Sequence, residues 1–157
     1  MFPQQTTMSI TTASEIADYF IYIANDTGSF ISNLKLQKLV YYAQAWHLGI
    51  HDTPLFDQDF EAWVHGPAIP SLFEEYKHFR WKPILKEVEK PKFPPELEEF
   101  LEDIIKEYFI CEGLELEMMS TREQPWIKAR KGLPRDEHSD AIISKESMRE
   151  YYKERAA

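Results

Sequence analysis

Cysteine, glycine and long apolar runs are scarce in this sequence. Cys111 is the only cysteine among 157 residues, which excludes an internal disulfide framework and fits a reducing cytoplasm. The five glycines are nowhere clustered, so no glycine-rich loop is present to hold phosphates. No stretch approaches the ~18 apolar residues of a membrane span, and residues 1–12 lack the basic and apolar segments of a signal peptide. We therefore expect a cytoplasmic protein with no membrane partner.

Positive charge is also in short supply. The formal net charge is −9, and residues 86–117 hold 11 acidic and four basic residues. This balance argues against a fold-wide nucleic-acid surface and favours a basic protein partner. One basic cluster exists, formed by Lys128, Arg130, Lys131 and Arg135. It either contacts a phosphate or an acidic partner, or complements helix ends and acidic residues of its own domain.

What the sequence does contain is enough apolar material for one folded domain. Hydrophobic residues make up 43% and aromatic residues 14% of the chain. We expect a lead-in over residues 1–11 and a single domain over residues 12–157, mainly α with a minor β element (α+β). Thr12, Ser32 or Asn33, and Ser144 are candidate helix caps, and Pro70 suits a first helical turn. Other predicted elements are a helix ending at Gly49, a strand over 59–65 broken by Gly66-Pro67, a short strand over 84–88, and helices over 96–111 and 114–121.

Four residues raise the question of chemistry. His47 and His51 have the i, i+4 spacing of a metal pair, with Glu61 and His65 further along. Because Gly49 is expected to end the helix between them, the two histidines need not share a face. Glu61 and His65 are either an acid–base couple or polar residues around an exposed or half-buried Trp63. We expect no catalytic residue, no bound metal and no cofactor; a metal-dependent enzyme using these four residues is the alternative function.

Two motifs carry a resemblance to a known family. Residues 34–46 read LKLQKLVYYAQAW, and Phe56-Asp57 is followed by FEAWVHGP over residues 60–67 and by Pro70. These motifs resemble the signature helix and the strand-to-turn signature of the Panacea (SocA-like) antitoxin domain. Pro125-Trp126 and residues 143–146 resemble phage-associated members of the family.

The resemblance implies a non-enzymatic antitoxin that neutralises a cognate protein toxin by direct, stoichiometric contact. In the branch typified by SocA, the antitoxin is also an adaptor that delivers its toxin to the ClpXP protease. Homo-oligomers stay possible, whereas nucleic acid is not an expected partner. The remaining alternative is a phage or prophage accessory protein that binds nucleic acid through the basic cluster.

The expected partner-binding residues are Trp63, His65, Lys35, Lys38 and Tyr41. Strand alternation places Trp63 opposite the apolar side chains of its strand, beside polar His65. Lys35 and Lys38 lie off the apolar stripe of the signature helix, where they would meet a partner. Tyrosine and tryptophan dominate protein–protein hot spots, although core packing is the other reading for Tyr41.

Overall fold

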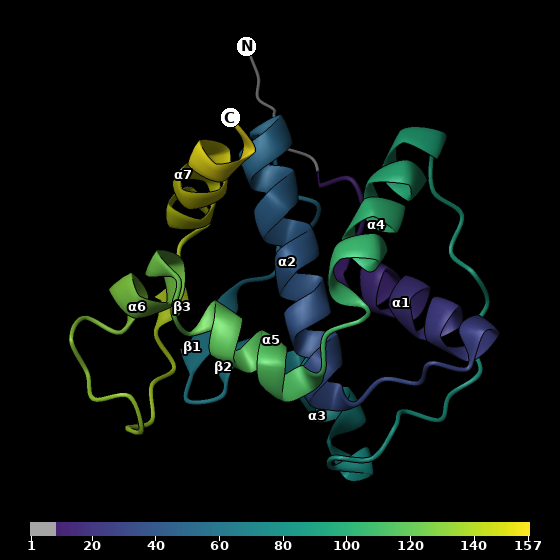
Figure 1. Ribbon diagram of the computed structural model, residues 1–157, viewed down its shortest axis with the longest axis horizontal. Helices are drawn as coiled ribbons and strands as arrows, with labels where there is room; N and C mark the ends of the chain where they lie inside the picture. Colours follow the sequence, from purple (N-terminus) through teal and green to yellow (C-terminus); the bar gives the residue numbers. More distant parts are fainter. Residues whose placement is uncertain (1–8) are drawn as a thin grey trace.

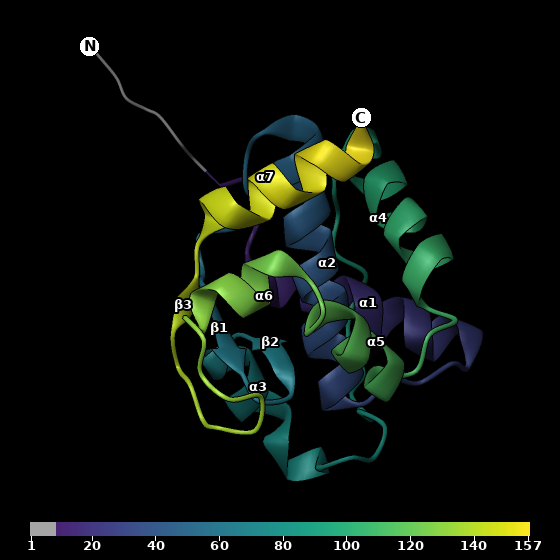
Figure 2. The ribbon, with the colours of Figure 1, turned by 60° about the vertical axis from the view of Figure 1, so that its left-hand side comes forward.

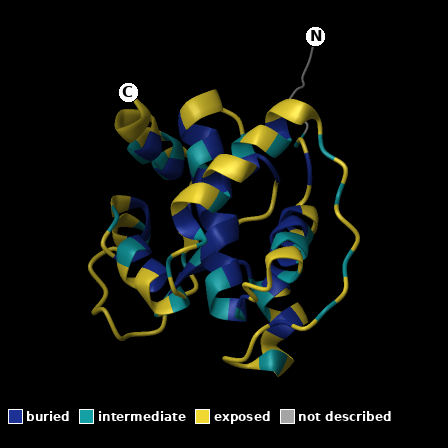
Figure 3. Ribbon diagram, turned by 45° about the vertical axis from the view of Figure 1, so that its right-hand side comes forward, coloured by how far each residue is buried: buried dark blue, intermediate teal, exposed yellow. Residues whose placement is uncertain are grey.

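A central helix organises the fold. The computed structural model describes residues 9–157, and in it α2 (Asn33–His51) runs through the middle of the molecule with the other helices around it (Figures 1 and 2). The surrounding helices are α1 (Ala13–Thr27), α3 (Pro70–Tyr76), the 3-10 helix η1 (Lys77–Phe79), α4 (Pro95–Tyr108), α5 (Gly113–Ser120), α6 (Gln124–Ala129) and α7 (Lys145–Ala156). The predicted mainly α class with a minor β element is confirmed. α2 is buried along most of its length, and Figure 3 shows buried positions gathered in the middle of the molecule.

A small antiparallel sheet lies beside the lower half of α2 in Figure 1. Its strands are β1 (Phe60–Trp63), β2 (Gly66–Ala68) and β3 (Ile142–Ile143), in the order β2-β1-β3. The predicted alternation is confirmed in β1, where Phe60 and Ala62 are buried and their neighbours half-buried. The predicted break at Gly66-Pro67 is wrong, because these residues pair with β1 as an edge strand after a two-residue turn. An edge strand tolerates proline, which lacks one backbone donor.

The cap residues account for several helix boundaries. The side chains of Thr12, Ser32 and Ser144 each accept a hydrogen bond from the backbone three residues ahead, as expected of an N-cap. Pro70 is the first residue of α3, where its missing N–H costs nothing. These short-range signals were readable from the sequence and are confirmed.

Gly49 does not end the second helix. α2 continues to His51, and Asp52 caps it in the left-handed conformation. A Cβ on Gly49 would lie 2.6 Å from the carbonyl carbon and Cβ of Tyr152, so the glycine lets α7 approach the α2 backbone. The predicted stop was wrong because the residue serves close helix packing and not chain termination.

The segment between α3 and α4 contains no strand. Ile84 is buried and its N–H donates to the carbonyl of Ile31, 2.8 Å away, but residues 84–88 pair with no neighbouring strand. The helix predicted for residues 96–111 is observed as α4. Its buried positions, Leu97, Leu101, Ile104 and Tyr108, keep the helical spacing that predicted it.

Polar side chains of α2 hold the irregular chain that follows it. Gln44 donates to the carbonyl of Phe56 over 2.8 Å and accepts from the N–H of Leu55 over 2.7 Å. Gln37 accepts from the N–H of Ile69 over 3.0 Å in the same way. Both glutamines are buried, so their amides replace the partners that a sheet would give these backbone groups.

The N-terminal lead-in is described only in part. Residues 1–8 of the expected lead-in lie outside the described residues. At its end, the N–H of Thr11 donates to the carbonyl of Leu55 over 2.9 Å, and the Thr11 hydroxyl donates to Glu15 over 2.6 Å. Thr11 is therefore bound to the folded domain.

Candidate protein-binding site

Trp63 lies half-buried at the end of β1. Its indole Nε1 donates to Glu61 Oε1 over 2.7 Å, and its ring packs edge-on against Phe73 of α3 with centroids 5.2 Å apart. Its backbone carbonyl accepts from Nε1 of buried Trp126 over 2.8 Å. The Trp63 ring thus packs on α3, and it is held on a well-anchored strand.

The hairpin turn next to Trp63 is joined to α5 and to the loop over residues 131–140. The side chain of His65 is 75% exposed, and its Nδ1 lies 3.2 Å from Glu117 Oε2. Arg135 donates to the carbonyl of Val64 over 2.8 Å, and its guanidinium lies 3.7 Å from the same Glu117 oxygen. Polar contacts from two directions therefore fix the turn that carries His65.

Two of the five expected partner-binding residues are not on the surface. Lys38 and Tyr41 are buried, and the expectation that they face a partner is wrong. Tyr41 packs edge-on against Phe60 with ring centroids 5.2 Å apart. Lys35 is half-buried and donates to the carbonyl of Phe109 over 2.6 Å, and burial lowers its pKa. Trp63 and His65 are the two expected residues that stay available around the hairpin.

The burial of Lys38 has an electrostatic cost. Its Nζ donates to the carbonyl of Pro67 over 3.1 Å, and a Cβ added at Gly66 would lie 2.8 Å from the Lys38 Cε. Burial lowers the pKa of Lys38 to about 7, an effect that the carboxylate of Glu117 partly opposes. An amphipathic pattern does not reveal this, because it assigns a charged side chain to the solvent.

The stability of the domain is expected to rise with pH above 7 because of Lys38. Between pH 7 and about 10.5 the unfolded chain keeps the Lys38 proton that the folded chain has released, so the free energy of unfolding increases with pH. Lys38→Met should remove this dependence. Urea unfolding of both proteins at pH 7 and pH 9.5 measures it, and the difference between them cancels other titrating groups. Equal pH slopes would contradict the lowered pKa.

The basic cluster is divided between interior and surface. Arg130 is buried, donates to the carbonyls of Ala62 and Pro134 over 2.7 and 2.9 Å, and lies 4.6 Å from the centre of the Trp126 ring. Lys128 and Lys131 are exposed. Arg130 thus organises the loop over residues 131–140 through backbone carbonyls. The contact with an acidic residue of the same domain, which the internal reading expected, is made by Arg135 with Glu117.

The four candidate metal or acid–base residues do not converge. His47 and His51 do share a face, with ring centroids 4.6 Å apart, because α2 continues past Gly49. His47 Nδ1 lies 2.6 Å from the carbonyl oxygen of Thr53. Glu61 accepts a hydrogen bond from Trp63, and His65 is hydrogen-bonded to Glu117, so Glu61 and His65 do not form a couple. Among residues 9–157, no three histidine, cysteine or acidic side chains are placed to hold a metal ion.

A half-buried carboxylate at the start of α6, that of Glu123, was not predicted from the sequence. Glu123 accepts hydrogen bonds from the hydroxyls of Tyr42 and Tyr152, and burial raises its pKa despite these donors. Tyr42 also stacks on Tyr108 with ring centroids 4.3 Å apart. The network joins α2, α4, α6 and α7, so no local spacing could reveal it.

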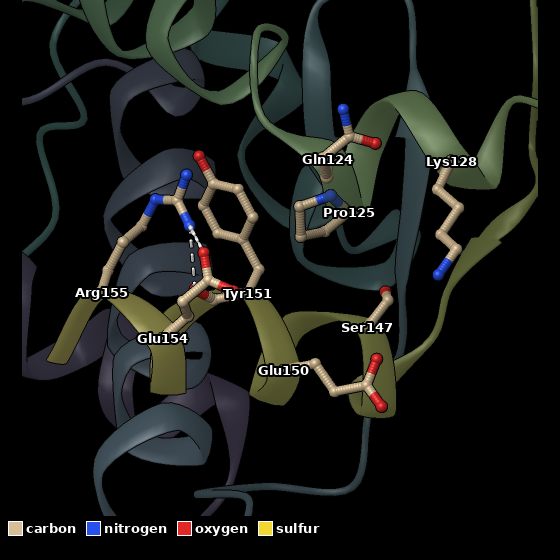
Figure 4. A pocket seen from close by; sticks show the side chains of 8 residues that line it. All are labelled: Gln124, Pro125, Lys128, Ser147, Glu150, Tyr151, Glu154 and Arg155. Atoms are coloured by element: carbon tan, nitrogen blue, oxygen red, sulfur yellow. Dashed lines mark hydrogen bonds and ion pairs between the residues drawn. The ribbon is translucent and has the colours of Figure 1, made fainter. Parts of the chain in front are cut away.

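A groove runs between α6 and α7 next to this network (Figure 4). Charged residues of both signs line it: the basic residues Lys128 and Arg155 and the acidic residues Glu150 and Glu154. The Arg155 guanidinium stacks on Tyr151 at 3.4 Å from the ring centre and lies 3.9 Å from Glu154. The groove therefore has no preference for a ligand of one charge.

Comparison with known families decides the relationship of the chain. Residues 36–127 match the family model described as "Antitoxin SocA-like, Panacea domain". The chain belongs to the SocA-like Panacea antitoxin family. The matched region includes most of α2, the β1–β2 hairpin and α3 to α5, and extends into α6, so Trp63 and His65 of this Panacea domain lie inside it. No curated protein and no solved structure matches the chain significantly. Within residues 9–157, none of the helices combines the length and apolar character needed to span a bilayer.

Proposed function

We propose that this Panacea domain neutralises a cognate protein toxin in the cytoplasm by stoichiometric binding, and that Trp63 and His65 contact the toxin. The observation that carries the proposal is the family match, which includes both residues. In this proposal the chain performs no reaction, and its effect on the toxin comes from covering a surface that the toxin needs. Transfer of the bound toxin to a ClpXP-type protease would be a separate, later step.

The position of Trp63 supports a binding role. A tryptophan on an anchored strand loses little conformational entropy when a partner covers it. Its hydrogen bond to Glu61 and its contact with Phe73 already restrict the indole. The exposed imidazole of His65 lies two residues along the chain and adds a polar group at the edge of the surface.

A titration without protease tests the mode of action. The probe is the purified product of the neighbouring reading frame, provided that its expression alone stops growth. If neutralisation is by binding, protection should saturate near one equivalent of this protein, and the complex should co-purify. Inactivation of excess toxin by a small fraction of an equivalent would indicate turnover and refute the binding mechanism.

Trp63→Ala is expected to weaken binding of this probe by about 2 kcal/mol or more, the effect of a hot-spot residue. Because the ring is half-buried against Phe73, a modest loss of thermal stability should accompany the change. Trp81→Ala is the matched control, since Trp81 is 75% exposed and follows η1, outside the β1–β2 hairpin in the chain. Calorimetric titration and thermal melting are measured for both. An unchanged affinity of Trp63→Ala, or a melting temperature so low that the domain unfolds, would exclude Trp63 as a binding residue.

A further inference from the structure

Three large apolar side chains stand exposed around the start of α5. Leu114 and Met118 are 68% and 49% exposed and lie one turn apart on the same side of the helix. Ile110, in the turn between α4 and α5, is 88% exposed. We call these residues the α5 strip. Isolated exposed apolar residues are common, but three within nine positions point to a surface that another molecule covers.

Acidic side chains predominate around the α5 strip. Residues 107–121 contain four acidic residues and no basic residue. Glu107, Glu112 and Glu115 are exposed, and within residues 9–157 none of them forms an ion pair. The nearby ammonium of Lys35 is bound to the carbonyl of Phe109. The rim therefore complements a partner that carries basic groups.

The opposite side of α5 is fixed to the core. Leu116 and Ser120 are fully buried, and the helix packs against α2 and β2. Glu117 of α5 contacts His65 of the hairpin, so the helix that carries Leu114 and Met118 is joined directly to the hairpin that carries Trp63 and His65. A strip held on a rigid support loses little entropy when it is covered, which favours binding.

We propose that the α5 strip binds a basic amphipathic segment of the toxin. This inference rests on the proposed function and extends its binding surface from the hairpin to α5. Apolar side chains of the segment cover Ile110, Leu114 and Met118, while lysine or arginine residues beside them face Glu112 and Glu115. Methionine adapts to apolar partners of varied shape, and an apolar helix face with a charged flank is a recurring mode of peptide recognition. The net charge of −9 speeds the approach of such a segment.

The experiment uses the same purified toxin candidate as probe and two exposed leucines as a matched pair. Leu114→Ser should weaken binding at least ~10-fold, whereas Leu85→Ser, at a leucine 69% exposed in the α3–α4 connection, should change it less than ~3-fold. Met118→Ser is a second variant on the strip. Because Leu114 and Met118 are exposed, both variants should melt within a few degrees of the parent; if both unfold, the strip is structural and the inference is wrong.

Charge reversal tests the basic character of the partner. Glu112→Lys with Glu115→Lys should lower the association rate constant about 10-fold and reduce its dependence on salt. Glu99→Lys with Asp103→Lys, at exposed positions of α4, is the control and should have a smaller effect on both quantities. An increase in affinity on reversal at α5 would show that the partner is acidic there and overturn the proposal.

The outcomes separate the inference from the proposed function. If the parent protein does not bind the toxin candidate, the proposed function fails. If the parent binds and Leu114→Ser and Met118→Ser bind equally well, only the inference about α5 fails. Sedimentation of the protein alone adds a third outcome. A dimer that dissociates in Leu114→Ser would show that a second copy of the chain covers the strip, which also overturns the proposed occupant.

Discussion

Ile104→Asp is expected to unfold or aggregate the domain at 25 °C. Ile104 is 5% exposed in the apolar stripe of α4. The substitution removes a buried side chain and places a carboxylate in the hydrophobic core. We expect a loss of about 4 kcal/mol or more, a large part of the 5–15 kcal/mol by which a domain is typically stable.

Chemical unfolding followed by circular dichroism measures this loss. Lys106→Asp is the control, because it introduces the same residue two positions away on the exposed side of α4. The control should retain its cooperative transition with a change below about 1 kcal/mol. A folded Ile104→Asp protein with near-parental stability would mean that α4 is not packed on the core through this stripe.

Gly49→Ala is expected to destabilise the domain by about 3 kcal/mol. The added methyl group would lie 2.6 Å from Tyr152, and two of the three nearest atoms belong to the backbone, which cannot rotate away. α2 and α7 must therefore separate, at the cost of the contacts between them. In an exposed helix the same substitution would stabilise by up to about 1 kcal/mol, so the sign of the effect is itself diagnostic.

Thermal melting compares Gly49→Ala with Gly28→Ala. Gly28 caps α1 with φ +69°, and a Cβ there meets nothing within 4 Å, so its substitution tests backbone strain without a clash. We expect a loss of about 1 kcal/mol at Gly28. A melting temperature for Gly49→Ala at or above that of the parent would show that α7 does not approach α2 as closely as the structure has it.

Local patterns in the sequence predicted the helices well and the contacts between segments less well. The spacing of Leu97, Leu101 and Ile104 predicted α4, and Ser144 predicted the start of α7, because both signals act within a few residues. Gly49 and Gly66 were read as breaks, although one admits α7 and the other opens β2. The meaning of each glycine depends on a segment distant in the chain.

The candidate site was predicted only in part for the same reason. Alternation along β1 placed Trp63 on the outer face, which needs only the two-residue period of a strand. Lys38 was assigned to the surface because of its charge, and the sequence does not show that the carbonyl of Pro67 accepts a hydrogen bond from its ammonium group. Glu123 gave no local signal, since its tyrosine partners come from α2 and α7.

The buried amides of α2 stabilise the fold of this domain, whereas the proposed partner contacts lie on other residues. Gln37 accepts a hydrogen bond from the backbone of Ile69, and Gln44 bonds the backbone of Leu55 and Phe56, so these residues of α2 specify how the chain folds. Leu114 and Glu115 are exposed and make none of these hydrogen bonds, so we expect a change there to leave the buried amides in place. The same fold can therefore accommodate different exposed residues on α5. We expect a grafted α5 surface to change which toxin is bound while the unfolding curve stays nearly the same.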